Sequence, residues 1–262
     1  MREVFSCLQM DFRRAFWSPR FAFAVIGTAI ALYSTVFQEI LPGMSCSLYY
    51  YNMSLGGIAP LIMVAVPYSM SFCSDWRNRF IRPCIIRSNP AGYAFSKIFT
   101  CGISTTAAIA LGHILFLLAL LTKYPFLDPG SSWSNYGGYG YFDNVIIAGH
   151  PILFIMIKIF LAALLGSMLA TIALCISTKI PNIFVVITSP ILAYYAIMNT
   201  CVILRFPVWI NLNALYHAGL QYAVKGTTTG QTLLYVFGIT VVICTLLGVV
   251  FYRNVKEKLE NG

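Results

Sequence analysis

The sequence predicts an all-α membrane protein with six transmembrane helices, and three observations support this fold class. Six apolar stretches of about 20 residues or more recur along the chain, which is the length that a helix needs to cross a hydrocarbon layer about 30 Å thick. Hydrophobic residues make up 59% of the 262 residues and charged residues only 10%, whereas soluble domains average about 25% charged residues. The mean hydropathy is +0.78. Because lipid offers no hydrogen bonds to backbone amides, these stretches must be helical.

The amino-terminal segment, residues 1–18, has a pattern of its own. Apolar side chains such as Phe5 and Phe12 recur at spacings of three and four, with arginines between them, which predicts an amphipathic helix on the inner membrane surface. A positively charged topology anchor and an elbow helix that touches a cytoplasmic partner are both open readings. Ser18-Pro19 then has the form of an N-cap followed by proline at the first helical position.

The six crossings follow in order, and the whole chain, 1–262, is expected to form one transmembrane domain. Each crossing is a run of apolar residues bounded by polar or turn-forming residues. The predicted crossings are 21–41, 54–74, 98–121, 152–177, 182–204 and 232–252.

The orientation follows from the distribution of positive charge over the short connections. With both termini in the cytoplasm, 13 of the 17 Lys and Arg residues lie on the inner side, and three lie outside, Lys123, Arg205 and Lys225. The formal net charge of +9 is explained by this bias and by attraction to anionic lipid headgroups. Nucleic-acid binding is the poorer explanation, because no soluble basic face carries interleaved aromatics.

The outer connections are less informative. Apolar and aromatic residues recur through 205–231 in a pattern that suggests one or two short amphipathic helices, which favours a re-entrant or interfacial hairpin between the last two crossings. These residues are Trp209, Leu212, Leu215, Tyr216, Leu220 and Tyr222. Cys46 is the one cysteine expected in an outer loop, and a bridge from it to Cys201 is an open alternative.

The connection over 75–97 is the segment that suggests a mechanism. Charged and apolar residues alternate in it. Pro83 interrupts any single continuous helix, so the residue at which a helix begins is not defined by the pattern, and Asn89-Pro90 marks a turn before the third crossing. A short helix around 83–87 would expose Ile85 and Ile86 to a groove on another protein. The alternative reading is a positively charged loop that only fixes the topology.

This connection resembles the cytoplasmic loop of ABC-2-type ABC transporter permeases, which also have six crossings, internal termini and an amphipathic first helix. The residues that carry the resemblance are Asp75-x4-Phe80-Ile81-Arg82-x4-Arg87-x5-Tyr93-x2-Ser96-Lys97. The size of the chain is most similar to the small bacterial permeases of peptide-antibiotic immunity and drug export.

The resemblance implies a multi-pass subunit in the bacterial cell membrane that exports an amphipathic compound or peptide. It implies a dimer with an identical or homologous permease, two copies of a separate P-loop ATPase, and ATP and Mg²⁺ bound on that ATPase. The chain has no GxxxxGK[ST] sequence, so we expect it to bind no cofactor and to catalyse no reaction itself.

The resemblance also assigns roles within the loop, which would plug into the ATPase. Asp75 would cap or orient it. The remaining contacts are assigned to Arg77, Arg79, Arg82 and Arg87, facing acidic groups or lipid phosphates, and to Phe80, Ile81, Ile85 and Ile86, packing in the groove.

Three polar residues in the predicted crossings are candidates for a pathway or gate. Glu39 and Lys158 lie at comparable depth near the outer side, where they form either a pair or two separate interfacial residues. His113 in the third crossing either lines a cavity or bonds to a neighbouring helix.

Other function classes are less well supported. An ion- or proton-coupled secondary transporter has only Glu39 and Lys158 as coupling charges. A non-transporting membrane scaffold is a further open alternative. An intramembrane enzyme lacks its usual signatures, because the sequence contains neither HExxH nor GxSxG.

Overall fold

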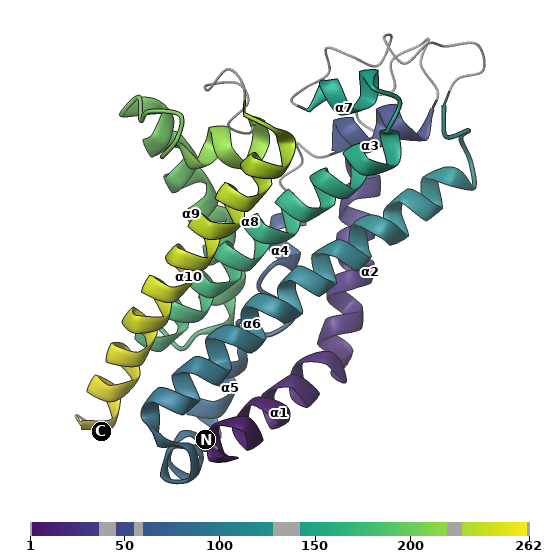
Figure 1. Ribbon diagram of the computed structural model, residues 1–262. Coiled ribbons are helices and arrows are strands. Elements are labelled where there is room, and N and C mark those ends of the chain that lie inside the picture. The colour runs from purple at the N-terminus through teal and green to yellow at the C-terminus, as the bar shows by residue number, and fades with distance from the viewer. Residues whose placement is uncertain (1, 37–45, 55–59, 128–141, 219–226, 261–262) are drawn as a thin grey trace.

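The long helices of the bundle run side by side in the computed structural model, with the two termini at the same end (Figure 1). The structure describes residues 2–36, 46–54, 60–127, 142–218 and 227–260, and these ranges contain no β-strand. Five of the described helices are long and apolar enough to cross a membrane, so the chain has the character of a multi-pass membrane protein. They are α2 (Pro19–Val36), α6 (Ile81–Leu121, with its apolar part from Asn89), α8 (Pro151–Lys179), α9 (Ile183–Ile203) and α10 (Thr229–Glu260).

Shorter helices lie at the ends of the bundle and between the long ones. In chain order they are α1 (Arg2–Phe16), α3 (Ser47–Ser54), α4 (Pro60–Met63), α5 (Ser71–Arg77), α7 (Asp143–Ile147) and a π-helical turn, Ala214–Ala218.

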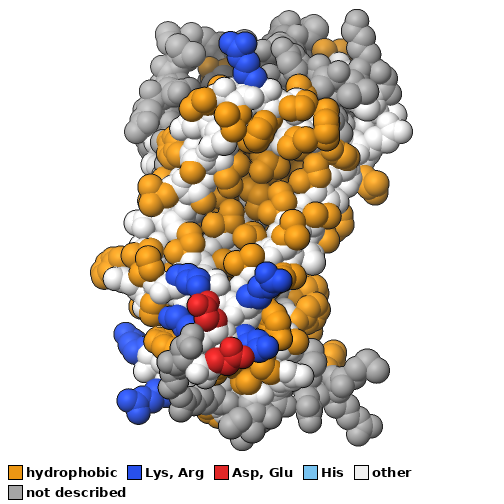
Figure 2. Space-filling view, turned by 90° about the vertical axis from the view of Figure 1, so that its left-hand side faces the viewer, with side chains coloured by type: hydrophobic (Ala, Val, Ile, Leu, Met, Phe, Trp, Pro, Cys, Tyr) orange, Lys and Arg blue, Asp and Glu red, His pale blue; other side chains and the backbone are white. Residues whose placement is uncertain are grey.

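Helix α8 occupies the centre of the bundle. In its apolar window 72% of the residues are buried within the chain, whereas the corresponding value for α10 is 11%. Helices α6, α9 and α10 pack around α8, and α2 packs on the far side of α6. The outer helices therefore present apolar side chains outward, as a membrane protein requires (Figure 2).

The first long helix begins where the Ser18-Pro19 pair predicts it. Helix α2 starts at Pro19, and the amide of Phe21 donates to Ser18 Oγ at 3.3 Å. Helix α1 precedes it and packs against α6 through a stripe of buried residues, Cys7, Asp11 and Ala15, spaced by four.

The segment predicted as the second crossing, 54–74, is not one continuous helix, which corrects that expectation. Helix α4 ends at Met63, and turns follow until α5 begins at Ser71. Pro67 explains the break, because its ring would clash with the carbonyl of residue 63 and it lacks an amide hydrogen.

Side chains of neighbouring helices compensate for this break. Thr105 donates to the carbonyl of Val64 at 3.4 Å, and Ser69 donates to the carbonyl of Ala170 at 3.0 Å. All residues from Val64 to Cys73 are buried within the chain. Irregular backbone at membrane depth is tolerated under this condition, that protein surrounds it.

The connection over 75–97 is mostly helical rather than a loop. Helix α6 begins at Ile81, so Pro83 falls in its first turn, where a missing amide hydrogen costs no hydrogen bond. A kink at Asn89, with φ 64° and ψ 148°, then separates residues 81–88 from the long apolar part. The break expected at Asn89-Pro90 is thus confirmed, and the helical residues 81–88 include the short helix expected around 83–87.

Two predictions about the outer side have different outcomes. Cys46 and Cys201 carry free thiols, so they do not form a disulfide. Within 205–231 the structure describes turns and the π-helical turn, but residues 219–226 lie outside the described ranges, and the hairpin stays a prediction.

Candidate functional site

A cluster of buried charges joins three segments at the end of the bundle that holds the termini. Lys97 on α6 donates to Asp75 Oδ2 at 2.8 Å and to Asp11 Oδ1 at 3.0 Å. The Lys97 side chain is 1% exposed, and those of Asp75 and Asp11 are 1% and 0% exposed. Arg14 on α1 closes the cluster, because its guanidinium donates to Asp75 Oδ1 at 2.8 Å. We call these four residues the charge cluster.

Hydroxyl groups donate further hydrogen bonds to the two carboxylates. Tyr68 donates to Asp11 Oδ1 at 2.5 Å, and Ser96 donates to Asp11 Oδ2 at 2.6 Å. Tyr93 donates to Asp75 Oδ2 at 3.2 Å. Two acids and two bases with this many hydrogen bonds form a neutral network, which makes burial of the charges tolerable.

The surroundings of Asp75 favour its ionised form. Burial alone would disfavour the carboxylate, but the attraction and hydrogen bonds of Lys97, followed by those of Arg14, outweigh it and lower the pKa of Asp75 below its ordinary value. The folded state therefore binds a proton at Asp75 less readily than the unfolded chain does.

This difference predicts a loss of stability in acid. The contribution of Asp75 is complete above about pH 5 and is lost progressively as the pH falls from about 4 through the lowered pKa of the folded carboxyl group, because the unfolded carboxyl group is protonated first. The melting temperature of the purified protein, measured from pH 7 to pH 3, should fall more steeply for the wild type than for Asp75→Asn. Parallel curves for the two proteins would contradict this assignment.

Beside the charge cluster, a tight turn exposes residues 76–80. Asp75 also contributes to this turn through its backbone, because its carbonyl oxygen accepts a hydrogen bond from the amide of Phe80 at 2.9 Å. Arg79 adopts a left-handed conformation with φ 55°, which reverses the chain between α5 and α6. The turn contacts two other helices: Arg14 of α1 lies 5.7 Å from the Phe80 ring centroid, and Lys258 of α10 lies 4.4 Å from that of Trp76.

The residues predicted to couple this connection to an ATPase divide into several groups. Arg77, Arg79 and Phe80 are exposed on the turn, whereas Asp75 and Ile81 are buried inside the chain. Ile81 is 4% exposed, so it packs in the core rather than in a partner's groove. Ile85 is partly buried against the same core. The backbone of Arg82, Ile86 and Arg87 lies in α6, but their side chains lie outside what the structure describes.

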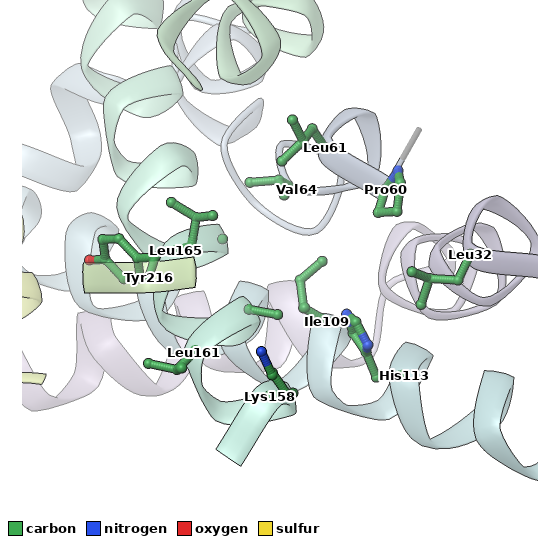
Figure 3. A pocket seen from close by; sticks show the side chains of 12 residues that line it. Leu32, Pro60, Leu61, Val64, Ile109, His113, Lys158, Leu161, Leu165 and Tyr216 are labelled. Atoms are coloured by element: carbon green, nitrogen blue, oxygen red, sulfur yellow. The ribbon is translucent and has the colours of Figure 1, made fainter. Parts of the chain in front are cut away.

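The candidate pathway residues divide in a similar way. His113 of α6 and Lys158 of α8 line one pocket of about 100 Å³ between the helices (Figure 3). Glu39 lies outside the described residues, so the proposed Glu39–Lys158 pair stays a prediction. The His113 ring is 3% exposed, and its Nδ1 lies 3.2 Å from the hydroxyl of Tyr51.

Asp11, Arg14 and Tyr68 are the members of the network to which the sequence analysis assigned no site role. Asp11 lies on the same helical face as Cys7 and Ala15. An acidic residue among small, uncharged residues on one face was the sequence pattern that could have indicated a buried charge there. The sequence analysis did not predict that Lys97 is the buried partner of both acids. Tyr93, Ser96 and Lys97 do, however, belong to the motif that carries the family resemblance.

Comparison of the chain with protein-family models, curated proteins and solved structures finds no match.

Proposed function

We propose that this chain is the permease subunit of an ATP-driven exporter of the ABC-2 type, working as a dimer in the bacterial cell membrane. It would receive mechanical work from two copies of a separate P-loop ATPase, which bind ATP and Mg²⁺. The proposal includes six crossings, with the broken segment 54–74 as the second, an outer hairpin over 205–231, and both termini in the cytoplasm. Its cargo would be an amphipathic compound or peptide.

The observation that carries the proposal is the connection between the exposed turn and the long helices. Asp75 belongs both to the turn, through its carbonyl oxygen, and to the charge cluster, through its side chain. Lys97 then joins the cluster to α6, and Asp11 joins it to α1. A partner that displaced the turn would therefore move α1 and α6 with it, because removing any one buried charge from the network is costly.

The turn also has the composition of a protein contact. Trp76 is 38% exposed and Phe80 is 40% exposed, and both lie beside the exposed Arg77. Aromatic residues and arginine are the residue types most enriched in the binding hot spots of protein interfaces.

Substitution of Phe80 provides the test. Phe80→Asp places a carboxylate near Arg14 and removes the apolar contact from the turn. In cells co-expressing a tagged P-loop ATPase encoded beside the gene, we expect Phe80→Asp to reduce co-purification with that ATPase at least about tenfold, equivalent to about 1.4 kcal/mol.

A matched control is available at a second exposed phenylalanine. Phe206 is 38% exposed and lies after α9, outside the 75–97 connection. Phe206→Asp should leave ATPase binding unchanged. Equal binding by the wild type, Phe80→Asp and Phe206→Asp would refute the assigned contact, and transport by the purified chain without any ATPase would refute the function.

A secondary transporter is the second candidate, favoured by one observation. His113 and Lys158 line the same pocket between apolar helices, where ionisable residues commonly serve ion or proton pathways. Transport driven by a proton gradient in the absence of ATP would select this candidate.

A further inference from the structure

A groove of about 690 Å³ runs between α6 and α10, with α8 as its floor. Its lining residues lie within 91–106 of α6, 160–171 of α8 and 237–252 of α10, all in helices apolar enough to span a membrane. Phe95 of α6 and Val249 of α10 are exposed on its walls, whereas Ser167 and Thr171 of α8 are buried at its base. The volume falls in the range of ligand sites, roughly 300–1,000 Å³. We call this feature the α6–α10 groove.

The Ser and Thr hydroxyl groups along the groove already have partners in their own helices. Thr106, Ser167 and Thr171 each donate to a carbonyl three or four residues earlier, at 2.7 to 2.9 Å. Thr240 and Thr245 of α10 do the same at 2.7 and 2.8 Å. The lining that the structure describes contains no Asp, Glu, Lys, Arg or His. The α6–α10 groove therefore offers mainly apolar contact, which suits a hydrocarbon chain better than a polar ligand.

The two ends of the groove differ in character. At the end away from the termini, Phe160 of α8 stacks on Phe237 of α10, with ring centroids 6.4 Å apart. At the other end the lining includes Ala91 of α6 and Tyr252 of α10, and Arg253 follows directly in the sequence. The groove thus extends from an aromatic pair to the level at which the charged residues of α10 begin.

Basic residues continue the groove-lining face of α10 beyond its apolar part. Arg253 and Lys256 follow the lining residues Val249 and Tyr252 by four positions, so they lie one turn further along the same face. Both are exposed, and Lys256 remains accessible because its contact with the exposed Glu260 is a loose pair at 3.7 Å.

The surroundings of these two residues carry a net positive charge. Figure 2 shows charged side chains gathered at the lower end of the visible face, below a broad apolar area. Basic residues outnumber acidic ones among the described residues at the ends of α8 and α10, where Lys179, Arg253, Lys256 and Lys258 stand beside Glu257 and Glu260. Positive charge at the level of the headgroups attracts anionic lipids.

We propose that the α6–α10 groove binds an anionic phospholipid from the leaflet on the side of the termini. One acyl chain lies between α6 and α10, and the phosphate contacts Arg253 and Lys256. A second copy of the chain is the poorer occupant, because a two-fold interface at this face would bring the same basic residues towards each other. The binding does not depend on the export function proposed above.

The experiment counts the lipids that the purified full-length chain retains in dodecyl maltoside micelles, by native mass spectrometry. The probes are phosphatidylglycerol and phosphatidylcholine with identical acyl chains, each titrated separately. We expect the wild type to bind phosphatidylglycerol at least about tenfold more tightly, the order expected of two basic residues beside one phosphate. Arg253→Gln combined with Lys256→Gln should remove this preference, and Arg253→Lys combined with Lys256→Arg should retain it.

A matched pair of charge changes controls for the overall charge of the protein. Lys123 and Arg205 are exposed beyond the ends of α6 and α9, at the end of the bundle away from the termini. Lys123→Gln combined with Arg205→Gln removes two positive charges there and should leave phosphatidylglycerol binding at the wild-type level.

A matched pair of glycine substitutions tests whether the groove holds the acyl chain. A Cβ atom at Gly102, which lines the groove, or at Gly238, which does not, would meet nothing within 4 Å. Both leucine variants should therefore fold. Gly102→Leu should weaken the binding of both lipids several-fold because it fills the groove, whereas Gly238→Leu should bind both like the wild type.

Three results would overturn the proposal. Equal affinity of the wild type for the two lipids would remove the phosphate contact, and wild-type lipid binding by Gly102→Leu would show that the chain lies elsewhere. A change from dimer to monomer in Gly102→Leu with unaltered lipid binding would assign the groove to a second copy. Loss of the preference in the Arg253 and Lys256 double glutamine variant, together with weaker binding by Gly102→Leu, would support the site whether or not an ATPase drives the chain.

Discussion

Replacing Lys97 with methionine is expected to lower the free energy of unfolding by about 3–5 kcal/mol, the typical cost of leaving a buried charge without its partner. The ammonium group lies within 3.0 Å of oxygen atoms from both Asp11 and Asp75. In the variant, the two buried carboxylates would share one cation of the charge cluster, the guanidinium of Arg14, which lies 4.0 Å from Asp11. Unfolding of the purified protein by sodium dodecyl sulfate in mixed micelles measures the change.

A second substitution tests whether charge balance is the cause. Asp11→Asn added to Lys97→Met removes one negative charge, so the double variant should be more stable than Lys97→Met alone. Lys179→Met serves as the matched control, because Lys179 pairs with Glu257 at 3.0 Å on the exposed surface, where such pairs contribute about 1 kcal/mol or less. A similar loss for the Lys97 and Lys179 variants would show that the charge cluster does not stabilise the fold.

Replacing Gly112 with leucine is expected to separate α2 from α6. A Cβ atom at Gly112 would lie 2.6 Å from Cβ of Thr28 and 3.0 Å from the carbonyl oxygen of Val25, and both of these atoms belong to α2. Thr28 is fully buried, and its hydroxyl donates to the carbonyl of Ala24, so it has little freedom to move aside. Overpacking of this kind costs about 1–3 kcal/mol, and the larger leucine side chain should reach or exceed the upper value.

The same substitution at Gly102, elsewhere on α6, provides the comparison. Gly102 also lies in α6, but a Cβ atom there would meet nothing within 4 Å. Gly102→Leu should therefore leave the midpoint of thermal unfolding close to that of the wild type, whereas Gly112→Leu should lower it by several degrees. Equal midpoints for the two variants would show that α2 does not pack on α6 at this contact.

These two predictions concern two of the contacts that hold α6 in place. The charge cluster fixes its end near the termini to α1 and α5, and the approach at Gly112 fixes its middle to α2. The proposed function requires the first contact to transmit movement, so Lys97→Met should also reduce coupling to an ATPase.

Much of the fold could be predicted from local sequence. The apolar runs that form α2, α6, α8, α9 and α10 show their length and composition without any tertiary information. Ser18 and Pro19 mark the start of α2 because capping and the fixed φ of proline act within a few residues. The break in 54–74 was less visible, since Pro67 indicates a kink but not the side chains of α6 and α8 that compensate for it.

The sequence by itself determined which segments are helical and apolar, because helix length, periodicity and proline effects are local properties of the chain. Only the tertiary structure decided that Asp11, Asp75 and Lys97 meet in one buried network, and that His113 and Lys158 line one pocket. Asp11 and Lys97 are 86 residues apart. Their contact depends on how α1 packs against α6, and no local pattern specifies which face of one helix meets which face of another.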